Sequence, residues 1–246
     1  MVSDNAPQTD VKKKQRGVAA VFRALAILEA LETANMPRNL SELARATGLY
    51  KSTILRILES LQDEGYVVRV ENSKYALGPR IMQLGIAYER TNPLRHHVLP
   101  TLENLVTQGT ESASFHVRQN AQDRLCLFRV NSHHSTLDRV DAGDRLPIRR
   151  GAAGKVLLAF GDDKEPGGEM DDIRNTCVAV SLGERDKLCA GMAAPVFSGG
   201  GQRLIGALSL SGPMERFRPD DLERMKPQLL NAAREITQQL GGTYPL

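Results

Sequence analysis

Residues 39–77 read NLSELARATGLYKSTILRILESLQDEGYVVRVENSKYAL, and this stretch decides the fold of the N-terminal part of the chain. Asn39, followed three residues later by Glu42, forms a capping-box pattern that predicts the start of a short helix. Gly48 is expected to end that helix, because glycine readily adopts the left-handed backbone found after helix ends. A second helix is expected over residues 50–64.

The second helix and the segment after it complete a recognisable order. Apolar side chains repeat at helical spacing and form one buried stripe, at Ile54, Leu58 and Leu61. Gly65 ends the helix, and two β-prone runs, 66–70 and 74–77, then flank a polar turn at 71–73. Helix, turn, helix and hairpin in this order predict a winged helix-turn-helix.

The start of the second helix carries short and basic hydrogen-bond donors. A helix that reads DNA places its N-terminal residues near base edges and phosphates in the major groove. An ordinary amphipathic helix with a solvated polar face would explain one such residue, but not the whole order of elements. We expect the recognition helix and the wing to contact DNA through Lys51, Ser52, Thr53, Arg56, Asn72 and Lys74.

Charge and flanking segments agree with a nucleic-acid partner. Residues 1–90 hold 13 Lys/Arg and 10 Asp/Glu, whereas the remainder holds 19 of each, so the whole net charge of +3 lies in the N-terminal third. Residues 1–16 are polar and predict a disordered basic tail. A first helix is expected over 18–33, with one apolar face formed by Val18, Phe22, Leu25 and Leu28.

The remaining sequence predicts a second domain of mixed structure. A helix starts at Pro79 and is broken at 91–93, and another runs over 94–108. Short strands are expected at 112–117, 125–130, 178–181, 192–197 and 204–211, and helices at 152–160 and 220–240. Hairpins beside helices favour an antiparallel sheet in an α+β fold. The expected domains are a tail (1–16), a DNA-binding domain (17–78), a helical linker (79–93) and a second domain (94–246), with an exposed loop at 162–172.

Several other classes of protein are disfavoured. The three cysteines, Cys126, Cys177 and Cys189, show no metal-binding or disulfide spacing. The run from Gly151 to Lys155 lacks the remaining residues of a phosphate-binding loop. We find no catalytic set and expect no metal or cofactor. A signal core and membrane-length apolar runs are missing, which favours a cytoplasmic protein without a membrane partner.

The N-terminal motifs resemble those of the IclR family of bacterial transcription regulators. The family's S-E-L-A-x-x-x-G-L pattern matches residues 41–49, and K-S-T-x-x-R-x-L matches 51–58. E-G-Y and Y-x-L-G-P-R match 64–66 and 75–80. Tyr50 stands where the family often has Pro. The resemblance implies a DNA-binding regulator that reads a double-stranded operator.

The resemblance continues through 147–159, 193–197 and 207–213, and it implies a GAF-like domain that binds a small effector. Ser209 and Ser211 lie two apart, so both side chains point to one face of a strand. Matched effector positions are Leu146, Ala152, Ala153, Ser181, Gly191, Ser209 and Ser211. This chain departs from the family at Gly191, where many members have Cys, and at Cys177, where Gly is usual.

These observations predict a transcriptional regulator controlled by a small organic effector, either a carboxylate or an aromatic acid. The apolar surface over 81–86 and the resemblance imply a homodimer or a tetramer. Two alternatives remain. One is an enzyme with a DNA-binding appendage, which requires a convergent catalytic set. The other is a DNA binder that responds to no effector.

Overall fold

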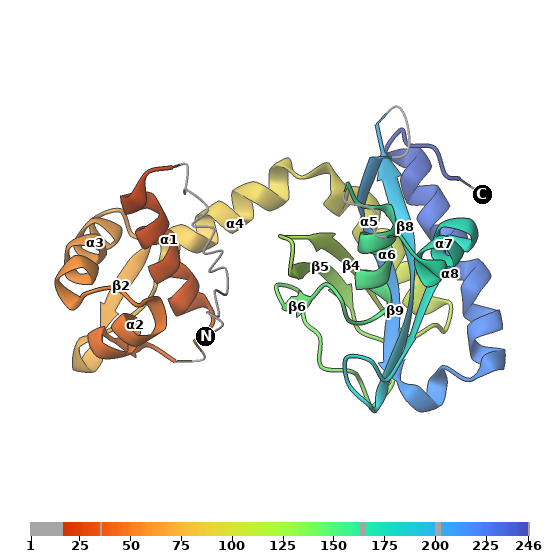
Figure 1. Ribbon diagram of the computed structural model, residues 1–246, viewed down its shortest axis with the longest axis horizontal. Helices are drawn as coiled ribbons and strands as arrows, with labels where there is room; N and C mark the ends of the chain where they lie inside the picture. Colours follow the sequence, from red (N-terminus) through yellow and green to blue (C-terminus); the bar gives the residue numbers. More distant parts are fainter. Residues whose placement is uncertain (1–16, 35, 163–165, 200–202, 246) are drawn as a thin grey trace, which may run out of the picture. The chain divides into compact units, whose positions relative to one another are not determined.

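Two structural units make up the chain. The computed structural model describes residues 17–34, 36–162, 166–199 and 203–245. The predicted basic tail, residues 1–16, lies outside these. The N-terminal unit ends at Thr91 and the C-terminal unit begins at Asn92 (Figure 1). No helix among the described residues combines the length and hydropathy that a membrane span requires.

The N-terminal unit contains three helices, a small sheet and a fourth helix. In chain order these are α1 (Ala19–Glu32), β1 (Arg38–Asn39), α2 (Leu40–Thr47), α3 (Lys51–Asp63), β2 (Val67–Val70), the 3-10 turn η1 (Glu71–Ser73), β3 (Lys74–Leu77) and α4 (Pro79–Thr91). The three strands are antiparallel in the order β1-β3-β2. The predicted winged helix-turn-helix is therefore confirmed.

Local sequence signals account for the ends of α2. The Asn39 side chain accepts hydrogen bonds from the backbone amides of Ser41 and Glu42, at 2.9 and 3.0 Å. The Glu42 carboxylate accepts one from the Asn39 amide at 2.7 Å, which completes the capping box. Gly48 then adopts a φ of 69°, as expected for a helix C-cap.

The core of the N-terminal unit uses a different face of α1 from the one the apolar spacing indicated. Ile27, Ala30 and Leu31 are buried against Ile54 and Leu58 of α3. Val18, Phe22 and Leu25 instead lie at the surface, with 40–66% of each residue exposed. Leu28, the fourth residue of the predicted face, does pack partly against the core. The spacing correctly found an apolar face. It could not show that α1 has two such faces and that tertiary packing covers only one.

The C-terminal unit is a six-stranded antiparallel sheet with helices on both faces. Its elements are α5 (Pro93–Thr107), β4 (Ser112–Arg118), β5 (Asp123–Val130), β6 (Arg145–Pro147), α6 (Ala152–Phe160), α7 (Gly168–Thr176), β7 (Ala179–Leu182), β8 (Cys189–Ser198), β9 (Arg203–Pro213), the 3-10 turn η2 (Met214–Arg216) and α8 (Pro219–Gln239). The strand order is β6-β5-β4-β9-β8-β7. The predicted α+β fold with an antiparallel sheet is confirmed.

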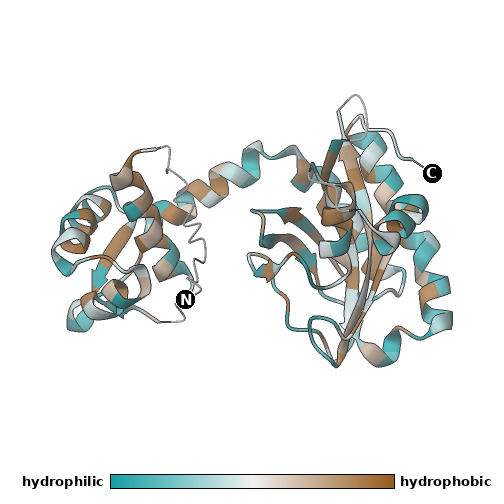
Figure 2. Cartoon of the chain, viewed as in Figure 1, coloured by the Kyte–Doolittle hydropathy of each residue, from teal (hydrophilic) through white to brown (hydrophobic). Residues whose placement is uncertain are grey.

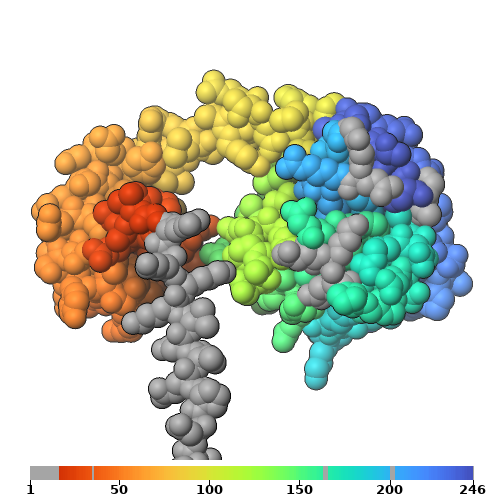
Figure 3. Space-filling view, turned by 45° about the horizontal axis from the view of Figure 1, so that its top comes forward, coloured from red at the N-terminus to blue at the C-terminus, as the bar shows by residue number. Residues whose placement is uncertain are grey.

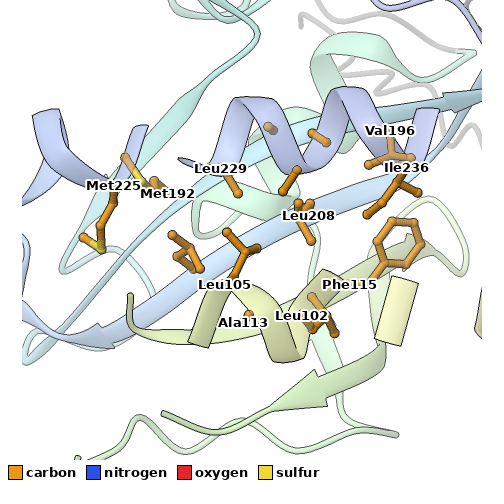
Figure 4. Packing of buried hydrophobic residues seen from close by; sticks show 14 of the residues in the cluster. Leu102, Leu105, Ala113, Phe115, Met192, Val196, Leu208, Met225, Leu229 and Ile236 are labelled. Atoms are coloured by element: carbon orange, nitrogen blue, oxygen red, sulfur yellow. The ribbon is translucent and has the colours of Figure 1, made fainter. Parts of the chain in front are cut away.

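The two faces of this sheet differ in chemistry. One face packs against α5 and α8 and forms the main core, where Phe115, Leu208 and Ile236 meet (Figure 4). The other face carries α6 and a smaller cluster of mostly small side chains, including Ala193 and Ala207. Figure 2 shows hydrophobic residues concentrated along the strands. The small side chains leave room on the α6 face for a cavity.

Two strands and one α-helix lie outside the elements expected from the sequence: the two-residue strand β1, the strand β6 and the helix α7. The loop expected over 162–172 is partly wrong, because α7 begins at Gly168 and anchors itself through the buried Ile173. α7 lies at the surface of its unit (Figure 3), which explains its polar composition. The short strand β6 was not predicted, because three residues carry too little periodicity to reveal a strand.

Candidate DNA-reading helix and ligand cavity

The N-terminal end of α3 presents basic and hydroxyl groups to solvent. Lys51, Ser52 and Arg56 are exposed and Thr53 is half-buried. Tyr50, the N-cap residue, is 84% exposed and contributes no capping hydrogen bond. Within the described part of the chain, no carboxylate pairs with Lys51 or Arg56. The cationic groups and the first amides of α3 are therefore available to an anionic partner.

A groove of about 690 Å³ runs between α3 and α1. Ser52, Thr53 and Arg56 line one side, and Arg23 of α1 lines the other. Arg23 is exposed and adds a basic group to this surface that sequence reasoning missed. Nothing in the sequence indicated this role, because Arg23 lies outside the helix-turn-helix motif.

The wing brings its two predicted residues to different positions. Asn72 lies at the exposed tip with a left-handed φ of 57°, a conformation that asparagine tolerates. An Arg69 guanidinium nitrogen donates to Ser73 Oγ at 2.8 Å across the turn. Lys74 is half-buried at the start of β3, opposite Asn39 of β1. Asn72 is thus more accessible to a DNA partner than Lys74.

The seven residues predicted to bind an effector all line one cavity on the α6 face of the C-terminal sheet. Its volume is about 40 Å³. From the sequence prediction it gathers Leu146, Ala152, Ala153, Ser181, Gly191, Ser209 and Ser211. Cross-strand register explains why three of them lie side by side in the sheet. Gly191 of β8 is the direct partner of both Ser181 on β7 and Ser211 on β9. Gly154 allows α6 to sit close, since a Cβ there would lie 1.9 Å from the Ile148 carbonyl oxygen.

The cavity also contains charged residues that sequence reasoning missed. Arg124, Arg185, Asp138 and His116 line it. They come from two strands and two loops and share no local motif. Only the antiparallel pairing of β4, β5 and β9 and the folding of the loops bring them to one place.

A buried ion-pair cluster borders the cavity. Asp138 accepts from Arg129 at 2.5 Å and from Arg185 at 3.2 Å. The side chains of Asp138 and Arg129 are 0% and 3% exposed, so both charges are desolvated. Arg124 instead donates to the Pro147 carbonyl and to the Arg150 carbonyl, the latter at 2.7 Å. Burial and the nearby Arg185 lower the pKa of Arg124 to about 10, so it remains a cation at neutral pH.

His116 faces the same cluster. One ring nitrogen, Nε2, lies 3.0 Å from Ser114 Oγ, whereas Nδ1 is buried and finds no hydrogen-bond partner in the described part of the chain. Burial, reinforced by Arg124, Arg129 and Arg185, holds the His116 pKa well below its usual value. The imidazole is therefore neutral at physiological pH and offers one unused polar atom.

The thiols and Lys155 provide no evidence for catalysis. Burial raises the pKa of Cys126 to about 12 and of Cys177 to about 11, and it also raises that of Cys189, so the neutral thiols dominate at neutral pH. Cys177 adopts a φ of 53° after α7, a left-handed conformation that favours glycine. Lys155 pairs with Glu169 and Glu184. The described residues contain no cluster suited to a metal ion.

Comparison with known proteins agrees with this architecture. Residues 20–71 match the IclR helix-turn-helix domain, and residues 167–238 match the C-terminal domain of the bacterial transcriptional regulator IclR. The glycerol operon regulatory protein of Streptomyces griseus is 30% identical over 227 residues, which cover 83% of this chain and 89% of that protein.

Solved structures have the same fold. An IclR transcriptional regulator from Alicyclobacillus acidocaldarius superposes with a TM-score of 0.79 at 22% identity, covering 92% of this chain and all of the other. An IclR homologue from Microbacterium hydrocarbonoxydans, solved with 4-hydroxybenzoate, gives a TM-score of 0.75 at 22% identity over 90% of this chain and 99% of its own. With both domain models and the 30% identical relative in agreement, this chain belongs to the IclR family of DNA-binding transcriptional regulators.

Proposed function

We propose that this chain controls transcription in response to a small organic acid that binds in the cavity of the C-terminal unit. The observation that carries the proposal is the convergence of seven predicted residues and two arginines, Arg124 and Arg185, on one cavity. Lys51, Ser52, Thr53 and Arg56 would read the operator, with the wing contacting its backbone. A hundredfold change in operator affinity would need about 2.7 kcal/mol of differential effector binding.

We also propose that the protein acts as a homo-oligomer. No residue of α4 is buried, and Met82, Leu84, Ile86 and Tyr88 are 46–71% exposed. The exposed face of α1 is apolar as well, with Val21, Phe22 and Leu25 at the surface. Covering these faces with a second copy would remove apolar surface from water, and a two-fold dimer would match two operator half-sites.

The test uses DNA selected in vitro from random sequence with the full chain. Affinity for the selected DNA is measured with and without a panel of small carboxylates. We expect at least one acid to change the affinity, and the Ser209→Ala/Ser211→Ala double variant to lose that response while still binding DNA. Ser198→Ala, on β8 outside the cavity lining, is the matched control. A DNA affinity that no acid changes would favour a regulator without an effector.

A further inference from the structure

The cavity holds more positive than negative charge. Among the described residues, Arg124, Arg185 and Asp138 line it, and Arg129 pairs with Asp138 beside it. Asp138 is already shared by Arg129 and Arg185, and Arg124 contacts only carbonyl oxygens. Lys155 pairs with Glu169 and Glu184, and none of these three residues belongs to the cavity lining. Arg124 is thus buried without a carboxylate partner among the described residues, and the partly exposed Arg185 shares Asp138 with Arg129, an arrangement that an anion would relieve.

Backbone amides add to this positive potential. Gly151, the N-cap of α6, supplies no side-chain cap, and its own amide donates to Glu184 at 3.3 Å. The next two amides, of Ala152 and Ala153, have no acceptor among the described residues, and both residues line the cavity. The positively polarised N-terminus of α6 and the Arg124 guanidinium therefore both raise the electrostatic potential in the cavity. A Cβ at Gly151 would lie 3.4 Å from a terminal nitrogen of Arg124.

Two buried polar atoms indicate that a ligand is expected here. Arg124 Nε and His116 Nδ1 have no hydrogen-bond partner among the residues that the structure describes, and the two residues are 3% and 4% exposed. Buried polar groups are nearly always satisfied, so each orphaned atom calls for an explanation. Both residues line the cavity. A bound oxygen-rich ligand would satisfy both.

The polar groups fall into two sets. One set is Arg124 with the first amides of α6. The other is Arg185 with the hydroxyls of Ser181 and Ser211, the latter 3.4 Å from an Arg129 nitrogen. The cavity of about 40 Å³ has room for roughly three water-sized groups, so a ligand that fills it without large rearrangement is short.

We infer that the ligand is a compact dicarboxylate, with one carboxylate bound by Arg124 and the α6 amides and the other by Arg185 and the serine hydroxyls. This inference rests on the proposed effector role of the cavity and specifies the effector's class. A monocarboxylate would occupy only one of the two sets of polar groups. An aromatic acid would require the cavity to expand.

The experiment measures binding to the full chain by calorimetry and thermal shift at matched ionic strength. The probes are oxalate, malonate and succinate, compared with acetate, propionate, benzoate and inorganic phosphate. We expect one dicarboxylate to bind at least tenfold more tightly than the monocarboxylate of similar length. Arg185→Gln should remove that preference while leaving monocarboxylate affinity within about threefold, because Asp138 keeps Arg129 as its partner. Arg124→Met should abolish binding of both.

Arg145→Gln is the matched control, because Arg145 lies on the neighbouring strand β6, pairs with Asp123 and is not part of the cavity lining. Arg185 is partly exposed, so its variant tests the inference even if Arg124→Met fails to fold. Equal affinity for mono- and dicarboxylates, tighter binding of benzoate, or binding of phosphate alone would overturn the dicarboxylate inference and leave an effector site in place. Failure of every acid to bind or to alter DNA affinity would overturn the proposed effector control as well.

Discussion

The DNA-reading helix and the ligand cavity hold their charges in opposite ways. Lys51 and Arg56 are exposed and belong to one continuous helix. Arg124, Arg129 and Asp138 are buried and come from segments far apart in the chain. An exposed charge keeps its hydration and costs little free energy in the folded protein. A buried charge loses its hydration and must be compensated within the fold or by a ligand. Substitutions of Lys51 or Arg56 should therefore alter DNA binding without destabilising α3. Substitutions that unbalance the buried charges around Asp138 should destabilise the C-terminal unit.

Asp138→Asn should give the largest effect. Removing the carboxylate shared by Arg129 and Arg185 leaves the buried Arg129 cation uncompensated, which costs about 3–5 kcal/mol of unfolding free energy. Chemical denaturation of the C-terminal unit measures the loss. Asp123→Asn, in the more exposed pair with Arg145, should stay near the wild-type midpoint. Equal midpoints for the two variants would show that the cluster does not stabilise the cavity.

Arg56→Ala should weaken binding to selected DNA by about 1–3 kcal/mol and relax the base preference, because a bidentate contact to guanine would be lost. The thermal midpoint should remain unchanged, since Arg56 makes no ion pair within the described residues. Lys51→Ala is the comparison variant. It should weaken binding to all sequences and reduce the salt slope by about 1. If the two variants behave alike, Arg56 contacts phosphate and not a base.

His116 should make the stability of the C-terminal unit depend on pH. Its pKa is lowered in the folded state, so the unfolded chain binds the proton more readily. Stability is then fully present above the unfolded value near 6.5 and falls as pH drops below it, with a slope of up to about 1.4 kcal/mol per pH unit. His116→Gln should reduce the slope of unfolding free energy against pH, as measured by denaturation curves at a series of falling pH values. His133→Gln, which removes an exposed histidine, controls for background titration, and an identical slope in both variants would contradict the expectation.

Asn39→Ala should give the smallest effect, about 1 kcal/mol, because it removes the cap of α2. Local packing of α2 supports α3, so DNA affinity should fall slightly with stability. Asn92→Ala removes the cap of α5, where Asn92 accepts from the Leu94 amide at 3.0 Å. It should cost a similar free energy in the C-terminal unit without changing DNA affinity. A DNA-binding loss in Asn92→Ala equal to that in Asn39→Ala would show that the two units are not energetically separate.

The N-terminal unit was the more predictable of the two. Caps such as Asn39 and Gly48 act within one helical turn, and the stripe of Ile54, Leu58 and Leu61 appears directly in the spacing. The buried face of α1 was not predictable, because apolar residues occur on both of its faces. Which face is covered depends on how α1 packs against α3.

By itself the sequence determined the order of helices and strands, the winged helix-turn-helix and the small residues that line the cavity. These features depend on caps, periodicity and motifs that act over a few residues. Only the tertiary structure decided the charge of the cavity. Arg124, Asp138 and Arg185 have no shared motif, and they meet because strand register and loop folding place them together. Their effect comes from burial and mutual distance, and neither quantity is present in a linear chain.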